Sequence, residues 1–305
     1  MCCCTSSFGL IYLRDVESKK TTCLHLEGGG SRCFFTLGVL SVFENNGLVF
    51  PTVYGVSAGA VCACLYQARQ IRRTIERIDD LPQEVSRCIS TGLDISDLTA
   101  FFPWMARVLH IDMEFGVEGD SSADVPSKIY SGLTSEYGEY TWIGLNQDQT
   151  WAEYVPVVAA SCSMPGTSEE VDINGVRYMD GAVYEGFSLD VAEAHGYSRH
   201  VAVFTRPRDV WLTEGDIPRE WTKGVQALPQ VAKALRGRVE RYNATKRRYL
   251  QLEERGEAVL IFPPEPLQVG VLEYRSDRLR ELVEMGIEQG KQALKHMQKD
   301  SFSCA

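Results

Sequence analysis

The chain has 305 residues, of which 44% are hydrophobic and 24% charged, and its formal net charge is −10. These fractions are typical of a globular protein with ample chain for a buried core, which excludes a mainly disordered or fibrous protein. The excess of 41 acidic over 31 basic residues argues against nucleic acid as a partner and against simple electrostatic docking on anionic lipid.

The N-terminal segment contains one short apolar stretch, Phe8–Leu13, and no basic region ahead of it. A secretory signal peptide needs a longer apolar stretch, and a transmembrane helix needs about 18 or more apolar residues in a row. We therefore expect a cytoplasmic protein, with transient contact with a membrane surface as an open alternative.

The ten cysteines are scattered without a regular disulfide framework, apart from the adjacent Cys2, Cys3 and Cys4. This pattern in a long chain without an export signal predicts free thiols. Cys62 and Cys64 form a C-x-C pair with no second pair nearby, so the spacing predicts no zinc site. We interpret Cys2–Cys4 as part of a flexible tail, with acylation or metal binding as the alternatives.

The first 70 residues alternate between strand-like and helix-like segments. A β-prone run over 21–26 leads into three glycines, and apolar residues then recur at helical spacing from Phe34 to Phe43. A second strand is predicted over 50–54, followed by Gly55-Val56-Ser57-Ala58-Gly59 and a helix of small residues over 60–68. This alternation is typical of an α/β fold with a parallel sheet.

The rest of the chain continues the alternation with longer helical segments. In order, we expect mostly helices over 71–130, strands over 127–134 and 139–145, a helix over 152–163, a hairpin with an Asn-Gly turn over 171–178, a strand over 200–205, an amphipathic helical region over 220–255, a strand over 258–262 and a helix over 277–298. We interpret the basic run Lys246-Arg247-Arg248 as a solvated helix face.

Ser57 lies between a predicted strand and a predicted helix, with Gly55 and Gly59 on either side. Glycines at these positions permit the strained strand-to-helix turn that exposes a serine hydroxyl in front of a helix N-terminus. The alternative is an ordinary glycine-rich loop that packs closely for steric reasons.

A second glycine-rich segment, Gly28-Gly29-Gly30-Ser31-Arg32, occupies another strand-to-helix junction. Three glycines let backbone N–H groups converge on an anion, and the following helix adds its positive end. A nucleotide phosphate is disfavoured, because no Gly-Lys-Ser/Thr is present and Cys33 stands where a dinucleotide fingerprint has its third glycine. The other fitting anion is the oxyanion of acyl transfer, with Ser57 as the nucleophile at the same edge of the sheet.

A serine nucleophile needs a base. None of the five histidines lies in a motif of its own: His25, His110, His195, His200 and His296. Asp180, followed by Gly181 and Ala182, is the better candidate, since a carboxylate before glycine suits a strand end with exposed backbone. An Asp-Gly pair by itself is also typical of a plain turn.

Together these three segments resemble the patatin-like phospholipase family, whose motifs have this order and roughly this spacing. The segment Ala160–Gly166 is similar to the small-residue and proline segment of that family. The resemblance covers residues 21–205, and the tail is similar to that of compact bacterial members.

The resemblance implies a three-layer α/β/α fold with a mainly parallel central sheet and a helical C-terminal extension. It implies a flexible lead over 1–20, a catalytic domain over 21–205 and a helical region over 206–305 packed on the same domain. The substrate expected is a lipid or another acyl ester, hydrolysed without metal or cofactor.

Site residues follow from the resemblance position by position. Ser57 is the expected nucleophile of a Ser–Asp dyad, and Asp180 is the general base. The oxyanion hole is expected from Gly28, Gly29 and Gly30, with Arg32, Gly55, Gly59 and Gly181 in supporting roles. One residue departs from the family pattern, because Cys33 stands where the family usually has glycine. Cys33 is strained if the loop keeps a positive φ there, and unstrained if the helix begins at Cys33, which the apolar spacing after it favours.

Two other functions stay open at this point. One is a Ser–His–Asp esterase acting on small soluble esters, and the other is a non-catalytic member of the fold that binds a lipid or a partner. An apolar stretch lies beyond the second motif and contains Leu98, Phe101, Phe102, Trp104, Met105, Val108 and Leu109. It could line an acyl pocket or act as a lid that touches lipid, and the alternative is a core helix that covers the sheet.

Overall fold

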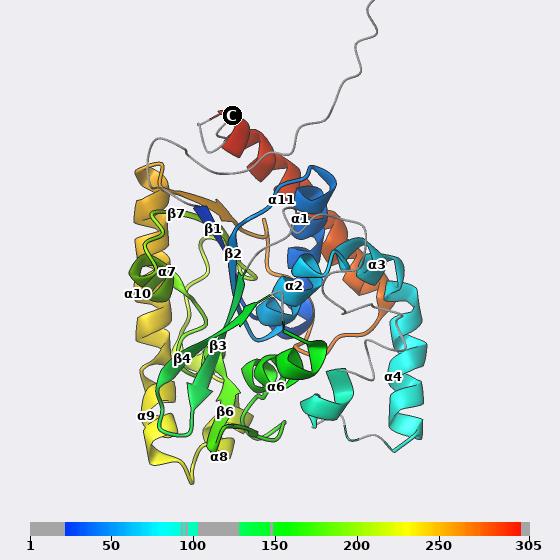
Figure 1. Cartoon of the computed structure of the whole chain (residues 1–305), viewed down its shortest axis with the longest axis vertical. Coiled ribbons are helices and arrows are strands. Elements are labelled where there is room, and N and C mark those ends of the chain that lie inside the picture. Colours follow the sequence, from blue (N-terminus) through cyan, green and yellow to red (C-terminus); the bar gives the residue numbers. More distant parts are fainter. Residues whose placement is uncertain (1–21, 93, 95–96, 103–127, 147–148, 300–305) are drawn as a thin grey trace, which may run out of the picture.

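The computed structural model describes residues 22–92, 94, 97–102, 128–146 and 149–299 (Figure 1). Some predictions concern residues outside these ranges. They are the lead over 1–20 with Cys2–Cys4, His110, and the part of the apolar stretch from Trp104 to Leu109. Among the described helices, none combines the length and the apolar character that a membrane crossing requires.

An eight-stranded mixed sheet forms the centre, in the order β5-β6-β3-β2-β1-β7-β8, with β4 also paired to β3. The strands are β1 (Thr22–Leu26), β2 (Thr52–Val56), β3 (Lys128–Ser135), β4 (Tyr140–Asn146), β5 (Val171–Ile173), β6 (Val176–Asp180), β7 (Arg199–Val203) and β8 (Ala258–Ile261). Strands β3, β2, β1, β7 and β8 are parallel neighbours, whereas β4, β5 and β6 pair antiparallel. The expected mainly parallel sheet is confirmed, with an antiparallel extension at one edge.

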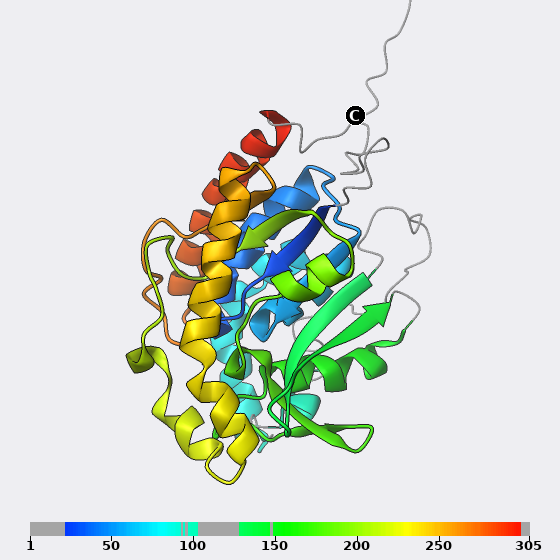
Figure 2. The ribbon, with the colours of Figure 1, turned by 90° about the vertical axis from the view of Figure 1, so that its left-hand side faces the viewer.

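Helices cover both faces of this sheet. They are α1 (Cys33–Asn45), α2 (Ala58–Gln67), α3 (Ile71–Glu76), α4 (Leu81–Ser90), α6 (Trp151–Cys162), α7 (Leu189–Ala194), α8 (Arg219–Gly224), α9 (Pro229–Arg236), α10 (Arg238–Glu254) and α11 (Ser276–Lys299). Figures 1 and 2 show α1, α2, α6 and α11 on one side of the sheet, with α7 and α10 on the other. Because both faces are covered, every residue of β1 and β2 is buried, which explains why these strands are mostly apolar.

The hairpin of β5 and β6 has the turn that its sequence predicts. Asn174 and Gly175 have φ values of 56° and 83°, the left-handed geometry that a two-residue hairpin turn requires. The hairpin returns the chain along β6, so that Asp180 ends at the edge of β3.

The helical region over 220–255 is divided into three helices. Gly224 ends α8, Pro229 begins α9 and Gly237 separates α9 from α10. The interpretation of the basic run as a solvated face is wrong for Lys246, which is fully buried. Its ammonium group donates hydrogen bonds to the carbonyls of Pro207 and Val210, at 3.0 and 2.8 Å.

Helix α1 begins at Cys33, which has an ordinary φ of −68°. The predicted start of this helix is therefore confirmed, and the cysteine carries no left-handed strain. Its side chain is buried, and its thiol donates a hydrogen bond to the carbonyl of Glu27, with Sγ 3.4 Å from the oxygen.

We expect Cys33→Gly to destabilise the protein by about 1 kcal/mol, because glycine adds backbone freedom in the first helical turn and removes a buried side chain. In thermal unfolding this corresponds to a Tm lower by about 2 °C for a chain of this size. A variant with a higher Tm than the wild type would contradict the helix start at Cys33.

Candidate active site

Ser57 occupies a sharp turn between β2 and α2. Its φ of 56° and ψ of −133° are strained for a residue with a side chain, and the geometry places Ser57 at the N-terminal end of α2. The flanking glycines are required for packing. A Cβ at Gly55 would lie 2.5 Å from the carbonyl oxygen of Gly59, and one at Gly59 would lie 2.3 Å from that of Leu26.

Ser57 and Asp180 meet because β2 and β6 lie end to end along one edge of β3. Val56 is paired with Gly132, and Asp180 with the next residue, Leu133. Strand β4 occupies the other edge of β3 over the same residues. The chain leaves the sheet at Ser57, so the edge of β3 beyond Gly132 is not paired with β2. Strand β6 pairs with that part of the edge.

The C-terminal end of α6 holds the backbone of both residues. The Ser161 hydroxyl accepts a hydrogen bond from the N–H of Ser57 at 2.9 Å and donates one to the carbonyl of Gly132 at 2.8 Å. The N–H of Asp180 donates to the carbonyl of Ser163 at 2.9 Å. The sequence singled out the segment 160–166 only by resemblance, and the hydrogen bonds of these serines were not predicted.

Burial changes the acidity of Asp180. The carboxyl group is 1% exposed, and desolvation raises its pKa to about 6. Hydrogen bonds from the Ser57 hydroxyl and from the N–H of Ala182, together with the Arg238 cation, act in the opposite direction. A carboxylate with this pKa, bonded to a serine hydroxyl, is a stronger proton acceptor than an exposed aspartate.

The glycine loop lies directly against Ser57. A Cβ at Gly28 would lie 2.8 Å from the Cβ of Ser57, so any side chain there would displace the serine. Gly30 has a φ of 57°, and the N–H of Ser31 donates to the carbonyl of Val271 at 2.8 Å. Within the described chain, the N–H groups of Gly28, Gly29 and Gly30 have no carbonyl partner.

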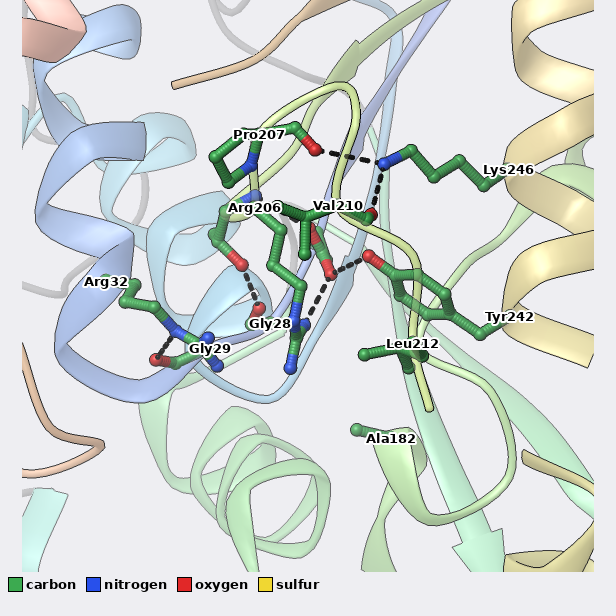
Figure 3. A network of polar contacts seen from close by, with 12 residues as sticks. Gly28, Gly29, Arg32, Ala182, Arg206, Pro207, Val210, Leu212, Tyr242 and Lys246 are labelled. Atoms are coloured by element: carbon green, nitrogen blue, oxygen red, sulfur yellow. Dashed lines mark hydrogen bonds and ion pairs between the residues drawn. The ribbon is translucent and has the colours of Figure 1, made fainter. Parts of the chain in front are cut away.

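The carbonyl groups of this loop, in contrast, are held by neighbouring side chains (Figure 3). The Thr205 hydroxyl donates to the carbonyl of Gly28 at 2.7 Å, and Arg32 Nε donates to that of Gly29 at 3.2 Å. With the carbonyls fixed, the loop keeps its N–H groups available for an anion. Arg32 therefore supports the loop geometrically, and its hydrogen bond is to the loop's own backbone.

A buried carboxylate, Glu27, organises the polar groups behind the glycine loop. It accepts hydrogen bonds from the N–H of Thr205 at 2.6 Å, from Arg206 at 3.1 Å and from the Tyr242 hydroxyl at 2.8 Å (Figure 3). These groups were not predicted as part of the site. Two signals were present in the sequence. Glu27 is a charged residue at the end of one apolar strand, and the polar pair Thr205-Arg206 lies at the end of another.

The described histidines have contacts of their own. His195 Nδ1 lies 2.7 Å from the Tyr54 hydroxyl, and His296 lies on the exposed side of α11. His25 and His200 are buried in β1 and β7, where their nitrogens Nε2 and Nδ1 lie 3.0 Å apart. The side-chain contacts of His25, His195 and His200 are thus with groups other than Ser57 and Asp180.

Cys23, His25 and His200 form a donor set that could hold a soft metal ion, which the sequence spacing did not predict. The Cys23 sulfur lies 3.2 Å from His25 Nε2 and 3.6 Å from His200 Nδ1. These polar atoms lie within hydrogen-bonding distance of one another, and all three residues are buried. The cysteines whose side chains are described are free thiols, namely Cys23, Cys33, Cys62, Cys64 and Cys162.

Comparison with known proteins gives two family matches. Residues 24–193, more than half of the chain, match the model of the patatin-like phospholipase family. Residues 228–299 match a domain of unknown function, DUF6363. The uncharacterized protein YjjU of Escherichia coli (strain K12) is 26% identical over 277 residues, covering 85% of this chain and 73% of that protein.

Two solved structures are similar at low sequence identity. VipD from Legionella pneumophila is 11% identical, with a TM-score of 0.45 over 92% of this chain and 67% of that chain. ExoU from Pseudomonas aeruginosa, solved in complex with SpcU, is 12% identical, with a TM-score of 0.34 over 92% of this chain and 52% of that chain.

The order of the glycine loop, the serine turn and the Asp-Gly strand end, on a mainly parallel sheet, agrees with the family match over residues 24–193. The chain belongs to the patatin-like phospholipase family.

Proposed function

We propose that this protein is a lipid acyl hydrolase of the phospholipase A or carboxylesterase type, and that it acts through a Ser57–Asp180 dyad. The observation that carries the proposal is the placement of the strained Ser57 and the buried Asp180 at neighbouring positions along β3, where the serine side chain acts on a carboxyl group whose pKa is raised to about 6. The family match supports a lipid substrate, since the family is one of phospholipases.

In the first step, Asp180 accepts the proton of Ser57 while Oγ attacks the ester carbonyl carbon. The bond from Oγ to carbon forms, and the carbonyl oxygen becomes an oxyanion. As the tetrahedral intermediate collapses, the bond from carbon to the alcohol oxygen breaks, and Asp180 returns the proton to the leaving alcohol. An acyl-enzyme on Ser57 results.

In the second step, a water molecule attacks the acyl carbon while Asp180 accepts one of its protons. Collapse of this intermediate breaks the bond to Oγ, returns the proton to Ser57 and releases the fatty acid. The free N–H groups of Gly28, Gly29 and Gly30 are the proposed donors to the oxyanion in both steps, because their partners are otherwise absent from the described chain.

Ser57→Ala is expected to abolish hydrolysis of a p-nitrophenyl ester and labelling by a fluorophosphonate probe, because it removes the nucleophile. The variant should remain folded and unfold close to the wild-type temperature, since alanine removes only a hydroxyl group. Labelling and turnover that persist in pure Ser57→Ala protein would assign the activity to another serine.

Asp180→Asn is expected to lower kcat by about 10²-fold or more, the usual worth of a general base. His195→Gln, His200→Gln and His296→Gln, measured beside it, should each keep most of the activity. A folded histidine variant without activity, together with an active Asp180→Asn, would replace the dyad with a Ser–His–Asp triad.

The pH dependence follows from the acidity of Asp180. Its ionised form is the base, and its pKa of about 6 means that protonation removes the base as the pH falls. We expect kcat/KM to be constant near pH 8 and to fall with an acid limb near pH 6, approaching tenfold per unit below it. A limb near pH 4, where an exposed aspartate titrates, would contradict this assignment.

A further inference from the structure

Helix α10 belongs to the segment that matches the domain of unknown function, and it contacts the turn after Asp180 and Glu27, the residue before the glycine loop. Arg238 and Tyr242 lie four residues apart, so they share one face of the helix. Both are nearly completely buried, at 5% and 1% exposure. A buried arginine and a buried tyrosine hydroxyl on one helix face both need partners, and these partners lie in different loops.

The Asp180 turn is held by the first of these residues. Arg238 Nε donates a hydrogen bond to the carbonyl of Ala182, in the short helical turn Gly181–Val183 that follows Asp180. One turn farther along the chain, Arg241 donates two hydrogen bonds to the carbonyl of Tyr184, at 2.8 and 3.1 Å. The guanidinium of Arg238 also lies over the ring of Trp221, 5.6 Å from its centre.

The glycine loop is reached through a chain of hydrogen bonds from the second residue. The Tyr242 hydroxyl donates to Glu27 at 2.8 Å, and the other oxygen of Glu27 accepts from the N–H of Thr205 at 2.6 Å. The Thr205 hydroxyl then donates to the carbonyl of Gly28 at 2.7 Å. Figure 3 shows Tyr242 and Arg206 approaching this carboxylate from opposite directions beside Gly28.

We infer that α10 sets the distance between the two halves of the site, with Arg238 and Tyr242 as positioning residues that fix the Asp180 turn and the glycine loop. The inference rests on the proposed function and assigns a role to the segment matched only to a domain of unknown function. The two residues act through backbone carbonyls and Glu27, and the charge of Arg238 also acts on Asp180 through space, while neither residue touches the reacting atoms.

The charged and titratable groups that act on Asp180 come from several elements. Among the residues that the structure describes, the cation that acts on Asp180 is Arg238 of α10. Its own pKa of about 10 keeps it charged throughout the working pH range. Cys162 of α6 and Tyr140 of β4 also face the carboxyl group, but their raised pKa values keep them neutral. Removing the charge of Arg238 therefore raises the pKa of Asp180. Loss of a purely structural helix contact would not change this pKa.

The first experiment compares Tyr242→Phe with Tyr249→Phe. Tyr249 is a matched control, because it is fully buried on the same helix and has no hydrogen bond to Glu27. We expect Tyr242→Phe to lower kcat on a p-nitrophenyl ester by about tenfold with little change in KM, because the oxyanion loop is displaced. An equal loss of kcat in both variants, or no loss of kcat in Tyr242→Phe, would overturn the role of Tyr242.

The second experiment compares Arg238→Gln with Arg248→Gln. Arg248 lies on the same helix in surface ion pairs with Asp190 and Glu193, so the control removes the same charge at a different place. We expect Arg238→Gln to raise the acid limb of kcat/KM by about half a unit or more, and Arg238→Lys to restore the limb. An acid limb that does not move in Arg238→Gln would overturn the role of Arg238.

A third measurement separates this inference from the proposed function. The ¹³C chemical shift of the Asp180 carboxyl group, followed against pH in the full chain, reports its pKa without any turnover. If the wild type has no hydrolase activity but Arg238→Gln still raises this pKa, the proposed function fails and the coupling to α10 holds. If the wild type is active and the pKa is the same in both proteins, the coupling fails alone.

Discussion

The edge of β3 is the constraint on which the candidate site depends. Two strands that arrive from different parts of the chain, β2 and β6, share this edge, and the boundary between them falls at Gly132 and Leu133. Ser57 is where β2 turns away, and Asp180 is where β6 ends. Because backbone pairing fixes both positions, the two side chains meet without a flexible loop between them and β3, and Ser161 ties the serine to the same strand.

The site combines two features that cost stability. Ser57 has a left-handed backbone, which a side chain disfavours by about 1–3 kcal/mol, and Asp180 is buried where its ionised form is poorly solvated. A carboxyl group with a raised pKa favours folding while it is protonated, and that contribution is lost as the pH rises through about 6. The hydrogen bonds from Ser57 and Ala182 and the charge of Arg238 offset part of this cost. Such a balance is typical of active sites, where stability is given up for reactivity.

The glycine loop is stabilised from behind by a carboxylate with three donors. Breaking a buried pair of this kind leaves an uncompensated charge, so Glu27, Arg206 and Tyr242 depend on one another. Their sequence separation is large, because Glu27 follows the first strand and Tyr242 belongs to the helical C-terminal region. The region that matches a domain of unknown function is therefore packed into the same polar network as the patatin-like part.

The sequence by itself determined the features that depend on neighbouring residues. The strand and helix alternation, the Asn174-Gly175 turn, the start of α1 at Cys33 and the glycines around Ser57 all follow from local conformational preferences. The pairing of β6 with β3, the raised pKa of Asp180 and the Tyr242–Glu27 bond were decided only by the tertiary structure. The same holds for Lys246, which the local pattern placed on a solvated face and which the fold buries against two carbonyls. In each case the deciding partner is distant in the chain, and burial, which sets the energy of a charge, is a property of the whole packed molecule.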